Sequence, residues 1–553
     1  MYEILGGVMT TDFFDFSNGH FTIAIIISII NAILLCYEGY KFMQIIQLNG
    51  YHIRGYFDWL KNTRAKYVLR LAMLSLISVA TLMVTNVIFN GHLEYLAYLG
   101  LVLYFALSLY FIINIYTAPK KTPLKMTNRM TRSMIVLFIV NLLISFGVIV
   151  LSSMFIDVLR FGAVALTPLI VPITVPFAHW VMKPIEKAIN QKYVHQAKKK
   201  LQEYPDLIKI GITGSYGKTS VKNFLDKILS EKYNVLSTPF NYNTTMGVTK
   251  SVIQFLDFSH QVFIAEMGAR TSGDIEELCD IVKPQFGIIT PVGEQHMATF
   301  HNIENVIKTK SELPQNLPEN GVCVFNLDNK FAKNIAQNAK CEKQFISIET
   351  NECNVWASDI VTTTEGTSFI LHIGDETIEC FTKVLGKHNI VNILLCIPIA
   401  IKLGLTLKEI KSGIDKIAPV DHRLQLIKSD NNVIVLDDAY NASIEGSKRA
   451  LEVLSMFEDR RKIVVTPGLV ELGSLEKLAN FSFGKDIAKV ADLVVIVNKT
   501  HYLAIREGLL EGGFNESNIF EAETFTMAQA VIKDLVSEGD IVLWENDLPD
   551  NYT

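Results

Sequence analysis

The chain has 553 residues, a formal net charge of −5 and a hydrophobic content of 49%. Its length predicts three or four domains of about 150 residues each. The nearly balanced charge excludes a broadly basic protein, so we expect no nucleic-acid partner. Its seven cysteines are scattered without a CxxC pair. That pattern disfavours a zinc site or a disulfide framework and favours reduced thiols.

The first third of the chain contains apolar stretches of the length that crosses a membrane. A bilayer core needs about 20 apolar residues in a helix. Five stretches reach or approach that length, at 21–37, 71–89, 93–116, 134–156 and 161–182. Residues 1–20 contain no Lys or Arg, which argues against a cleaved signal peptide. We therefore predict an all-α transmembrane bundle of about five helices over residues 1–190, embedded in a lipid bilayer.

The loops between these stretches alternate in charge. Lys and Arg concentrate in residues 38–66, in residues 117–133 and after residue 183, whereas the alternate connections are poor in cations. Basic loops remain in the cytoplasm. This alternation predicts a multi-pass protein with its N-terminus outside, a basic linker over 191–206, and the remainder of the chain inside the cell. No span centre carries an acid or a base, which disfavours a transporter.

From about residue 207 the pattern becomes that of an α/β protein. Strand-like runs at 208–213, 260–268, 286–293 and 321–328 alternate with amphipathic helical stretches, and a second such series begins near residue 432. Alternation of strands and helices predicts parallel sheets. We expect one α/β domain over 207–420 and a Rossmann-like α/β domain over 421–553.

The first strand leads into the glycine-rich sequence TGSYGKT at 213–219, followed by a helix. Glycines allow backbone N–H groups to approach phosphate oxygens, and a helix N-terminus favours anions. Lys218 would reach the terminal phosphates, and the hydroxyl of Thr219 would face Mg²⁺. The generic phosphate-loop pattern has a glycine where this chain has Ile212. The residues expected to hold ATP here are Gly214, Ser215, Gly217, Lys218, Thr219 and Ser220.

Further motifs carry a resemblance to a known family. They are EMGA at 266–269, KTKSE at 308–312, GKHNIVN at 386–392, HRLQ at 422–425 and DDAYNAS at 437–443. Together with the phosphate loop, they resemble the MurF group of the Mur ligases over roughly residues 207–545. The resemblance implies an ADP-forming ligase that activates a carboxylate as an acyl phosphate and joins it to an amine. In the MurF group the amine is the dipeptide D-alanyl-D-alanine, and the acceptor is a muramyl-tripeptide precursor of bacterial peptidoglycan.

The resemblance also implies roles for individual residues. Lys218 would contact the transferred phosphate. Thr219, Glu266, His296 and a carbamoylated lysine would hold Mg²⁺. Counting from His296 favours Lys310 as that lysine, with Lys308 as the fallback, and the expected catalytic residues are Lys218, Lys310 and His296. The remaining nucleotide contacts would be Asn389, Arg423, Asp438 and Asn441, although Asn389 at a helix start is also typical of a simple cap.

The chain departs from the resemblance in three places. Membrane spans replace the expected soluble sugar-binding domain, which opens the acceptor to a lipid-linked form. Thr244 and Thr245 stand where the family tends to have Asn and Glu. The last strand ends in LWENDLPD at 543–550 instead of Lys-Gly-Ser, which indicates either a changed amine specificity or a surface turn.

Three alternatives stay open from the sequence. The first is a Mur-type ligase that uses another acceptor, such as a lipid-linked or poly-γ-glutamate-like one. The second is a membrane transporter driven by a phosphate-loop ATPase. The third is a non-catalytic membrane scaffold, which the intact phosphate loop and Glu266 disfavour.

Overall fold

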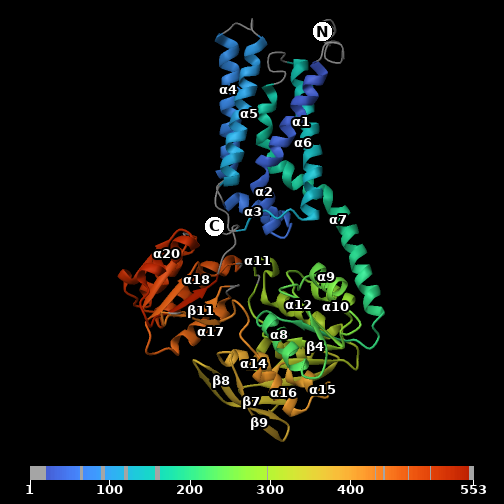
Figure 1. The fold of residues 1–553 in the computed structure, drawn as a ribbon, viewed down its shortest axis with the longest axis vertical. Helices are drawn as coiled ribbons and strands as arrows, with labels where there is room; N and C mark the ends of the chain where they lie inside the picture. Colours follow the sequence, from blue (N-terminus) through green and yellow to red (C-terminus); the bar gives the residue numbers. More distant parts are fainter. Residues whose placement is uncertain are drawn as a thin grey trace. The chain divides into compact units, whose positions relative to one another are not determined.

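The computed structural model describes residues 20–62, 66–88, 94–117, 122–155, 162–295, 297–429, 431–439, 443–470, 472–498 and 500–546. The chain divides into two compact units, with the boundary between Ile189 and Asn190. The first unit is helical and the second is α/β (Figure 1). The predicted change of fold class along the chain is therefore confirmed.

The first unit contains helices of widely different length. They are α1 (His20–Glu38), α2 (Tyr40–Leu48), α3 (Ile53–Asn62), α4 (Lys66–Ile88), α5 (Glu94–Thr117), α6 (Asn128–Phe155), the 3₁₀ helix η4 (Gly162–Ile170) and the first part of α7 (Val171–Gln202). In the described part, four stretches have the length and composition to cross a membrane, namely Phe21–Glu38, Gly100–Thr117, Asn128–Ser152 and Gly162–Gln202. Helix α4 adds a shorter apolar stretch, Tyr67–Thr81. The count of about five spans stays a prediction.

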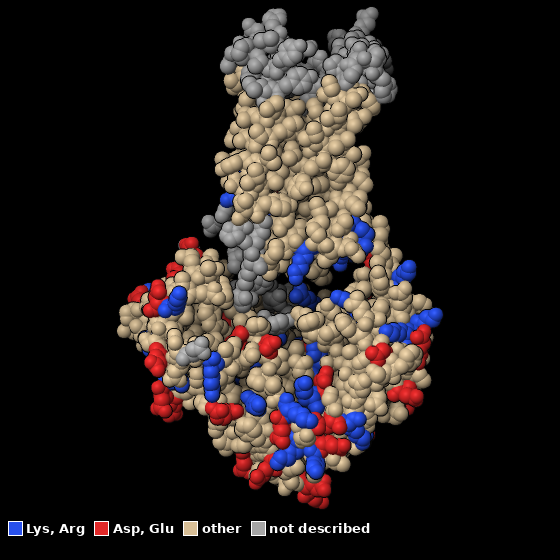
Figure 2. Space-filling view, viewed as in Figure 1, with Lys and Arg blue, Asp and Glu red and all other residues tan. Residues whose placement is uncertain are grey.

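The outer surface of this unit is apolar, and its interior contains polar contacts. Leu76, Leu143 and Ile173 are each about two-thirds exposed, and the visible face of the unit in Figure 2 is almost free of charged side chains. Inside, the Asn31 amide donates to Ser145 and Thr167, at 2.8 and 2.9 Å. Apolar exteriors with internally bonded polar groups are typical of helices surrounded by lipid.

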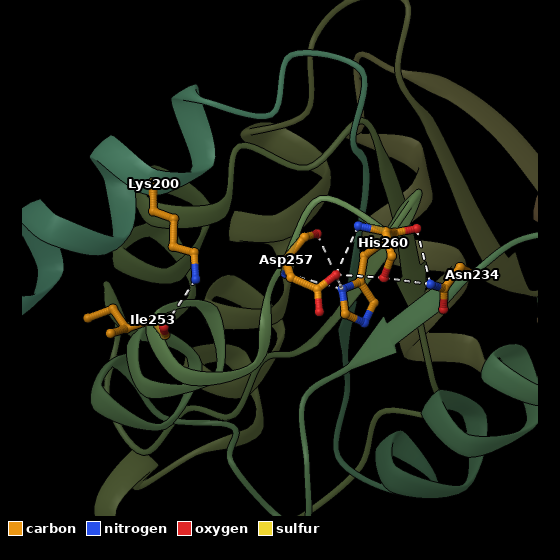
Figure 3. A network of polar contacts seen from close by, with 6 residues as sticks. Lys200, Asn234, Ile253, Asp257 and His260 are labelled. Carbon is orange, nitrogen blue, oxygen red and sulfur yellow. Dashed lines mark hydrogen bonds and ion pairs between the residues drawn. The ribbon is translucent and has the colours of Figure 1, made fainter.

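The second unit begins within helix α7. The segment predicted as a basic linker over 191–206 is largely helical, because α7 continues to Gln202. Ala197 and Leu201 of α7 are buried in the core of this unit. The Lys200 ammonium donates to the Ile253 carbonyl at 3.1 Å (Figure 3). The end of α7 is thus part of the core of the second unit.

The middle domain is built on a nine-stranded sheet of order β2-β3-β1-β4-β5-β6-β7-β8-β9. Its strands are β1 (Ile208–Thr213), β2 (Val235–Ser237), β3 (Val262–Glu266), β4 (Phe286–Ile289), β5 (Val322–Asn326), β6 (Glu342–Ser347), β7 (Val355–Thr363), β8 (Gly366–Ile373) and β9 (Glu376–Thr382). The strands from β2 to β7 pair in parallel, as predicted. The antiparallel meander of β7, β8 and β9 was not predicted.

Helices cover both faces of this sheet. They are α8 (Lys218–Leu229), α9 (Thr245–Phe255), α10 (Asp274–Val282), α11 (Met297–Phe300), α12 (Ile303–Gln315), α13 (Lys330–Gln337), α14 (Lys387–Leu394), α15 (Ile397–Lys402) and α16 (Leu407–Asp415). One buried cluster joins the sheet to α8, α14, α15 and α16, and another joins it to α9, α10, α12 and α13. The helix predicted over 386–404 is two helices, α14 and α15.

The C-terminal domain has a six-stranded sheet of order β10-β11-β15-β12-β13-β14. Its strands are β10 (Gln425–Lys428), β11 (Ile434–Asp438), β12 (Lys462–Thr466), β13 (Leu493–Val497), β14 (Ile519–Ala522) and β15 (Ile541–Glu545), with α17 (Ile444–Ser455), α18 (Glu476–Ala488), α19 (Tyr502–Glu511) and α20 (Phe525–Leu535). Every pairing except that of β10 with β11 is parallel. Strand β15 lies between β11 and β12, so the carboxyl ends of these three strands meet at one edge.

Candidate active site

The phosphate loop between β1 and α8 requires glycine at two positions. Gly214 and Gly217 have φ values of 150° and 78°. A Cβ atom at Gly214 would lie 2.0 Å from the Thr290 hydroxyl, and one at Gly217 would lie 2.6 Å from the Asn392 amide oxygen. Side chains are therefore excluded by contact as well as by backbone conformation. The loop can pack closely and still present its N–H groups at the start of α8.

The loop is also held from outside. The backbone N–H groups of Ser215 and Tyr216 both donate to the Pro291 carbonyl at 3.0 Å. The Ser215 hydroxyl donates to the Gly293 carbonyl at 3.0 Å and accepts from the Gly293 N–H at 3.1 Å. The segment after β4 thus fixes the shape of the loop before any ligand binds.

Lys218 lies at the first position of α8 and folds back over the loop. Its ammonium donates to the carbonyls of Gly214 and Ser215, at 2.8 and 2.9 Å. Burial lowers the pKa of Lys218 to about 8, while Glu266 opposes this shift and Arg423 adds to it. A polyphosphate bound here would favour the charged ammonium. Ser220 follows in the first turn of α8 and is half-buried.

Glu266 ends β3 beside the loop and is 1% exposed. One carboxylate oxygen accepts from the Thr219 hydroxyl at 3.2 Å and from the Asn243 amide at 3.0 Å. The other oxygen lies 3.3 Å from the Lys222 ammonium. A hydroxyl and a carboxylate that meet at one point are hard oxygen donors, which fits the ligand preference of Mg²⁺.

Lys222 is a site residue that the sequence reasoning missed. It is 2% exposed and donates to the Phe240 carbonyl at 2.6 Å in addition to its pairing with Glu266. Its position four residues after Lys218 in an amphipathic helix was the available signal, since residues i and i+4 share a face.

Lys310 and Lys308 have different environments in α12. Lys310 is 3% exposed, whereas Lys308 is exposed. Burial lowers the pKa of Lys310 well below its ordinary value, and the nearby Lys218 adds to this shift. His296, the other predicted metal ligand and catalytic residue, lies outside the described residues.

The nucleotide contacts predicted beyond the loop are partly described. Asn389 donates to the Leu385 carbonyl at 2.8 Å, so its amide already has a structural partner. Arg423 is close enough to influence the pKa of both Lys218 and Asp438. Burial raises the pKa of Asp438 to about 6 against the opposing charge of Arg423. Asn441 lies outside the described residues. Arg423 therefore contributes to the electrostatic environment of both Lys218 and Asp438.

Comparison with known proteins agrees with this geometry. Residues 212–400 match the Mur ligase middle domain, and residues 422–545 match the Mur ligase, glutamate ligase domain. The chain is 29% identical over 351 residues to the UDP-N-acetylmuramoyl-tripeptide–D-alanyl-D-alanine ligase of Bacillus subtilis (strain 168), over 63% of this chain and 75% of that protein. It is 31% identical over 307 residues to the protein of the same name in Escherichia coli (strain K12), over 55% of this chain and 67% of that protein.

Solved structures share the fold. MurF from Acinetobacter baumannii superimposes with a TM-score of 0.60 at 24% identity, over 66% of this chain and 78% of that chain. MurF from Thermotoga maritima in complex with ADP gives a TM-score of 0.58 at 24% identity, over 65% of this chain and 80% of that chain. The predicted resemblance is confirmed, and the chain belongs to the Mur ligase family of ATP-dependent, ADP-forming peptide ligases.

Proposed function

We propose that this chain is a membrane-anchored ligase that adds D-alanyl-D-alanine to a muramyl-tripeptide precursor during peptidoglycan synthesis in a bacterial cell. The observation that carries the proposal is the meeting of the phosphate loop with Glu266. Lys218, the Thr219 hydroxyl and the Glu266 carboxylate lie together at the N-terminus of α8. The proposed substrates are those given in the names of the similar proteins from Bacillus subtilis and Escherichia coli.

The reaction begins with attack of the acceptor carboxylate on the γ-phosphate of ATP, which yields an acyl phosphate and ADP. Two anions must approach each other, so the site has to supply positive charge where charge accumulates. Lys218 and the N–H groups of α8 do this from the protein. A Mg²⁺ ion held by Thr219 and Glu266 would neutralise phosphate charge. The Lys222 ammonium lies beside the Glu266 carboxylate and provides a nearby positive charge.

Lys310 is the residue that we propose to be carbamoylated. Only an uncharged amine can attack CO₂, and burial favours the uncharged form of Lys310. The amine nitrogen bonds to the carbon of CO₂ and releases one proton, which converts a buried neutral amine beside Lys218 into an anionic carbamate. The Lys218 ammonium would then attract this carbamate. Lys308 is exposed and lacks this environment.

The helical unit is proposed to anchor the enzyme in the cytoplasmic membrane, with the N-terminus outside and the ligase domains in the cytoplasm. Its apolar candidate spans and the alternating charge of its loops support this assignment. The family matches begin at residue 212, beyond the helical unit. An acceptor that is already lipid-linked remains an alternative within the same chemistry. A transporter or a poly-γ-glutamate-type ligase is a more distant one.

The test is ADP release by the full-length protein in detergent. ATP would be offered with the UDP-linked muramyl-tripeptide, with D-alanyl-D-alanine, and with both. We expect sustained ADP release and peptide formation only when both are present, because the acceptor alone can form the acyl phosphate but cannot complete the reaction. Equal ADP release in all three mixtures would reject the ligase assignment and favour the transporter. Coupling of a lipid-linked acceptor in preference to the UDP-linked one would reject the UDP-linked substrate.

A further inference from the structure

The C-terminal domain contains two neighbouring acids at the ends of adjacent strands. Asp438 ends β11 and Glu545 ends β15, and the two residues are register partners in this parallel pair. Register partners place their side chains on the same face of a sheet. Glu545 is fully buried, and neither of its carboxylate oxygens has a hydrogen-bond partner among the described residues.

A buried carboxylate without a donor is unfavourable, and a second acid beside it adds repulsion. Asp540 shows how the same domain treats another buried acid. Its two oxygens accept from the Arg461 guanidinium at 3.2 and 2.6 Å, and one also accepts from the Ser537 N–H at 2.7 Å. Glu545 has no such set of donors in the described part of the chain. Its environment suits a cation that arrives with a ligand.

The position of the pair indicates which ligand this is. Ligands of parallel α/β sheets bind at the carboxyl ends of the strands. Arg423 influences the pKa of both Asp438 and Lys218 of the phosphate loop, so the same guanidinium contributes to the electrostatic surroundings of the acid pair and of the loop. In the proposed reaction, the amine substrate brings an ammonium group to the acyl phosphate. The charge of this group suits the two acids.

The backbone around the pair is fixed. Asn546 follows Glu545 with a φ of 70°, and its N–H donates to the Asp438 carbonyl at 3.2 Å. Its side-chain amide donates to the Gly468 carbonyl at 2.7 Å, after β12. The three strand ends are thereby tied together. A rigid, partly unsatisfied pair of acids is suited to hold a small cation in one place.

We propose that the Asp438–Glu545 pair binds the ammonium group of the incoming amine and accepts one of its protons. This inference rests on the proposed function. The carboxylate takes a proton from R–NH₃⁺, and the nitrogen lone pair then attacks the carbonyl carbon of the acyl phosphate. The C–N bond forms and the C–O bond to phosphate breaks. Phosphate leaves with that electron pair and takes the second proton from nitrogen, which leaves the amide.

The acidity of the pair supports this role. Burial raises the pKa of Asp438 to about 6 and raises that of Glu545 well above its ordinary value, with Asp438 adding to the second shift. The charged groups around Asp438 are Arg423, which opposes its shift, and Asp437, which adds to it. Asp437 is itself paired with His422 at 2.7 Å. A base that titrates near neutral pH is effective in proton transfer.

The experiment compares two nucleophiles on the full-length enzyme in detergent. D-Alanyl-D-alanine arrives as an ammonium ion and needs the pair. Hydroxylamine is largely uncharged at neutral pH and can trap an acyl phosphate as a hydroxamate without it. For Glu545→Gln we expect dipeptide coupling to fall about 100-fold or more, the range of a lost general base. Hydroxamate formation should stay within about twofold of the wild-type rate.

Glu521→Gln is the matched control, because Glu521 lies on β14 of the same sheet and is exposed. It should leave both reactions unchanged. Equal loss of both reactions in Glu545→Gln, or no loss in either, would overturn the inference. Failure of the wild-type enzyme to couple the dipeptide at all would instead reject the proposed function.

A second readout separates proton transfer from support of the fold. Removal of Glu545, whose pKa is raised by burial and by Asp438, should move the acidic limb of the pH profile for the dipeptide to lower pH. If Glu545→Gln does not fold, Glu545→Asp keeps the charge on a shorter side chain. It should retain hydroxamate formation while coupling and its acidic limb change. An unchanged coupling rate and an unchanged acidic limb in Glu545→Asp would overturn the inference.

Discussion

Glu266 and Glu545 occupy equivalent places in two different domains. Each ends a parallel strand and is buried. Glu266 is surrounded by Thr219, Asn243 and Lys222, whereas Glu545 has an acid beside it and no hydrogen-bond partner in the described residues. A buried charge is stable only when partners compensate it. The charge of Glu266 is therefore compensated before any ligand binds, whereas the charge of Glu545 would be compensated only by a bound cation.

The difference assigns the two halves of the reaction to two domains. The middle domain would bind the phosphates of ATP in its preformed phosphate loop. The C-terminal domain supplies a site that becomes favourable when a cationic amine arrives. Binding energy from the amine would then help to close the site, which protects an acyl phosphate from water.

The largest expected effect is that of Lys218→Ala. Loss of the cation at the transferred phosphate should reduce ADP release at least about 1,000-fold, the effect of a comparable arginine in phosphoryl transfer. The measurement is a coupled ADP assay on the full-length protein. Lys227→Ala alters an exposed lysine of the same helix and should be neutral. Wild-type rates in Lys218→Ala would remove the basis of the middle-domain assignment.

Lys222→Met tests the compensation around Glu266. It leaves a buried carboxylate without its ion-pair partner, which costs about 3–5 kcal/mol of folding free energy. The melting temperature in detergent should fall clearly. Lys250→Met is the control, because Lys250 is exposed and bonded to Tyr242 on the surface. An unchanged melting temperature in Lys222→Met would mean that the ion pair does not stabilise Glu266.

Lys310→Ala should lower ligase activity at least about 100-fold, because loss of a proposed metal ligand should cost no less than loss of an outer partner of a metal site. The same variant should abolish any dependence of the wild-type rate on dissolved CO₂. Lys308→Ala changes an exposed neighbour in the same helix and should keep both the rate and the CO₂ response. If Lys308→Ala were the inactive variant, the choice of Lys310 would be wrong.

Glu545→Gln should change stability in the direction opposite to Lys222→Met. Replacing a buried acid that lacks a donor by a neutral amide removes a desolvation cost of about 1–3 kcal/mol. The melting temperature of the ligand-free enzyme should rise or stay level. A large fall would show that Glu545 is compensated in the folded protein, and the contrast with Glu266 would disappear.

The smallest effect is on pH dependence. The pKa of Lys218 is lowered to about 8, so its ammonium is charged below that pH and neutral above it. The KM for ATP should therefore rise by a few-fold as the pH is raised through about 8, since each pKa unit corresponds to about 1.4 kcal/mol. A KM for ATP that is flat from pH 7 to 9 would contradict this expectation.

Local patterns allowed much of the middle domain to be predicted. The run TGSYGKT between a strand and a helix defined the loop, and the structure explains it through the close contacts at Gly214 and Gly217. The alternating strands and helices predicted the parallel pairings around β1. Each of these features depends on residues that are near one another in sequence, so a pattern can reveal them.

Contacts between distant segments could not be predicted in the same way. Lys222 was overlooked because its partner Glu266 is 44 positions away in the chain. The departure at 543–550 was noticed, but its meaning depends on β15 inserting between β11 and β12. Only that strand order places Glu545 beside Asp438. The meander of β7 to β9 was overlooked although Gly374-Asp375, the two residues between β8 and β9, form a recognised hairpin signal.

The central claim is that one ATP is consumed for each amide bond formed by the phosphate loop and the acid pair acting together. The most direct measurement is simultaneous quantification of ADP and peptide product from the full-length enzyme with UDP-linked muramyl-tripeptide and D-alanyl-D-alanine. The account predicts equal amounts of ADP and product, and no product without ATP. ADP release that continues at the same rate without the dipeptide, with no product formed, would contradict it.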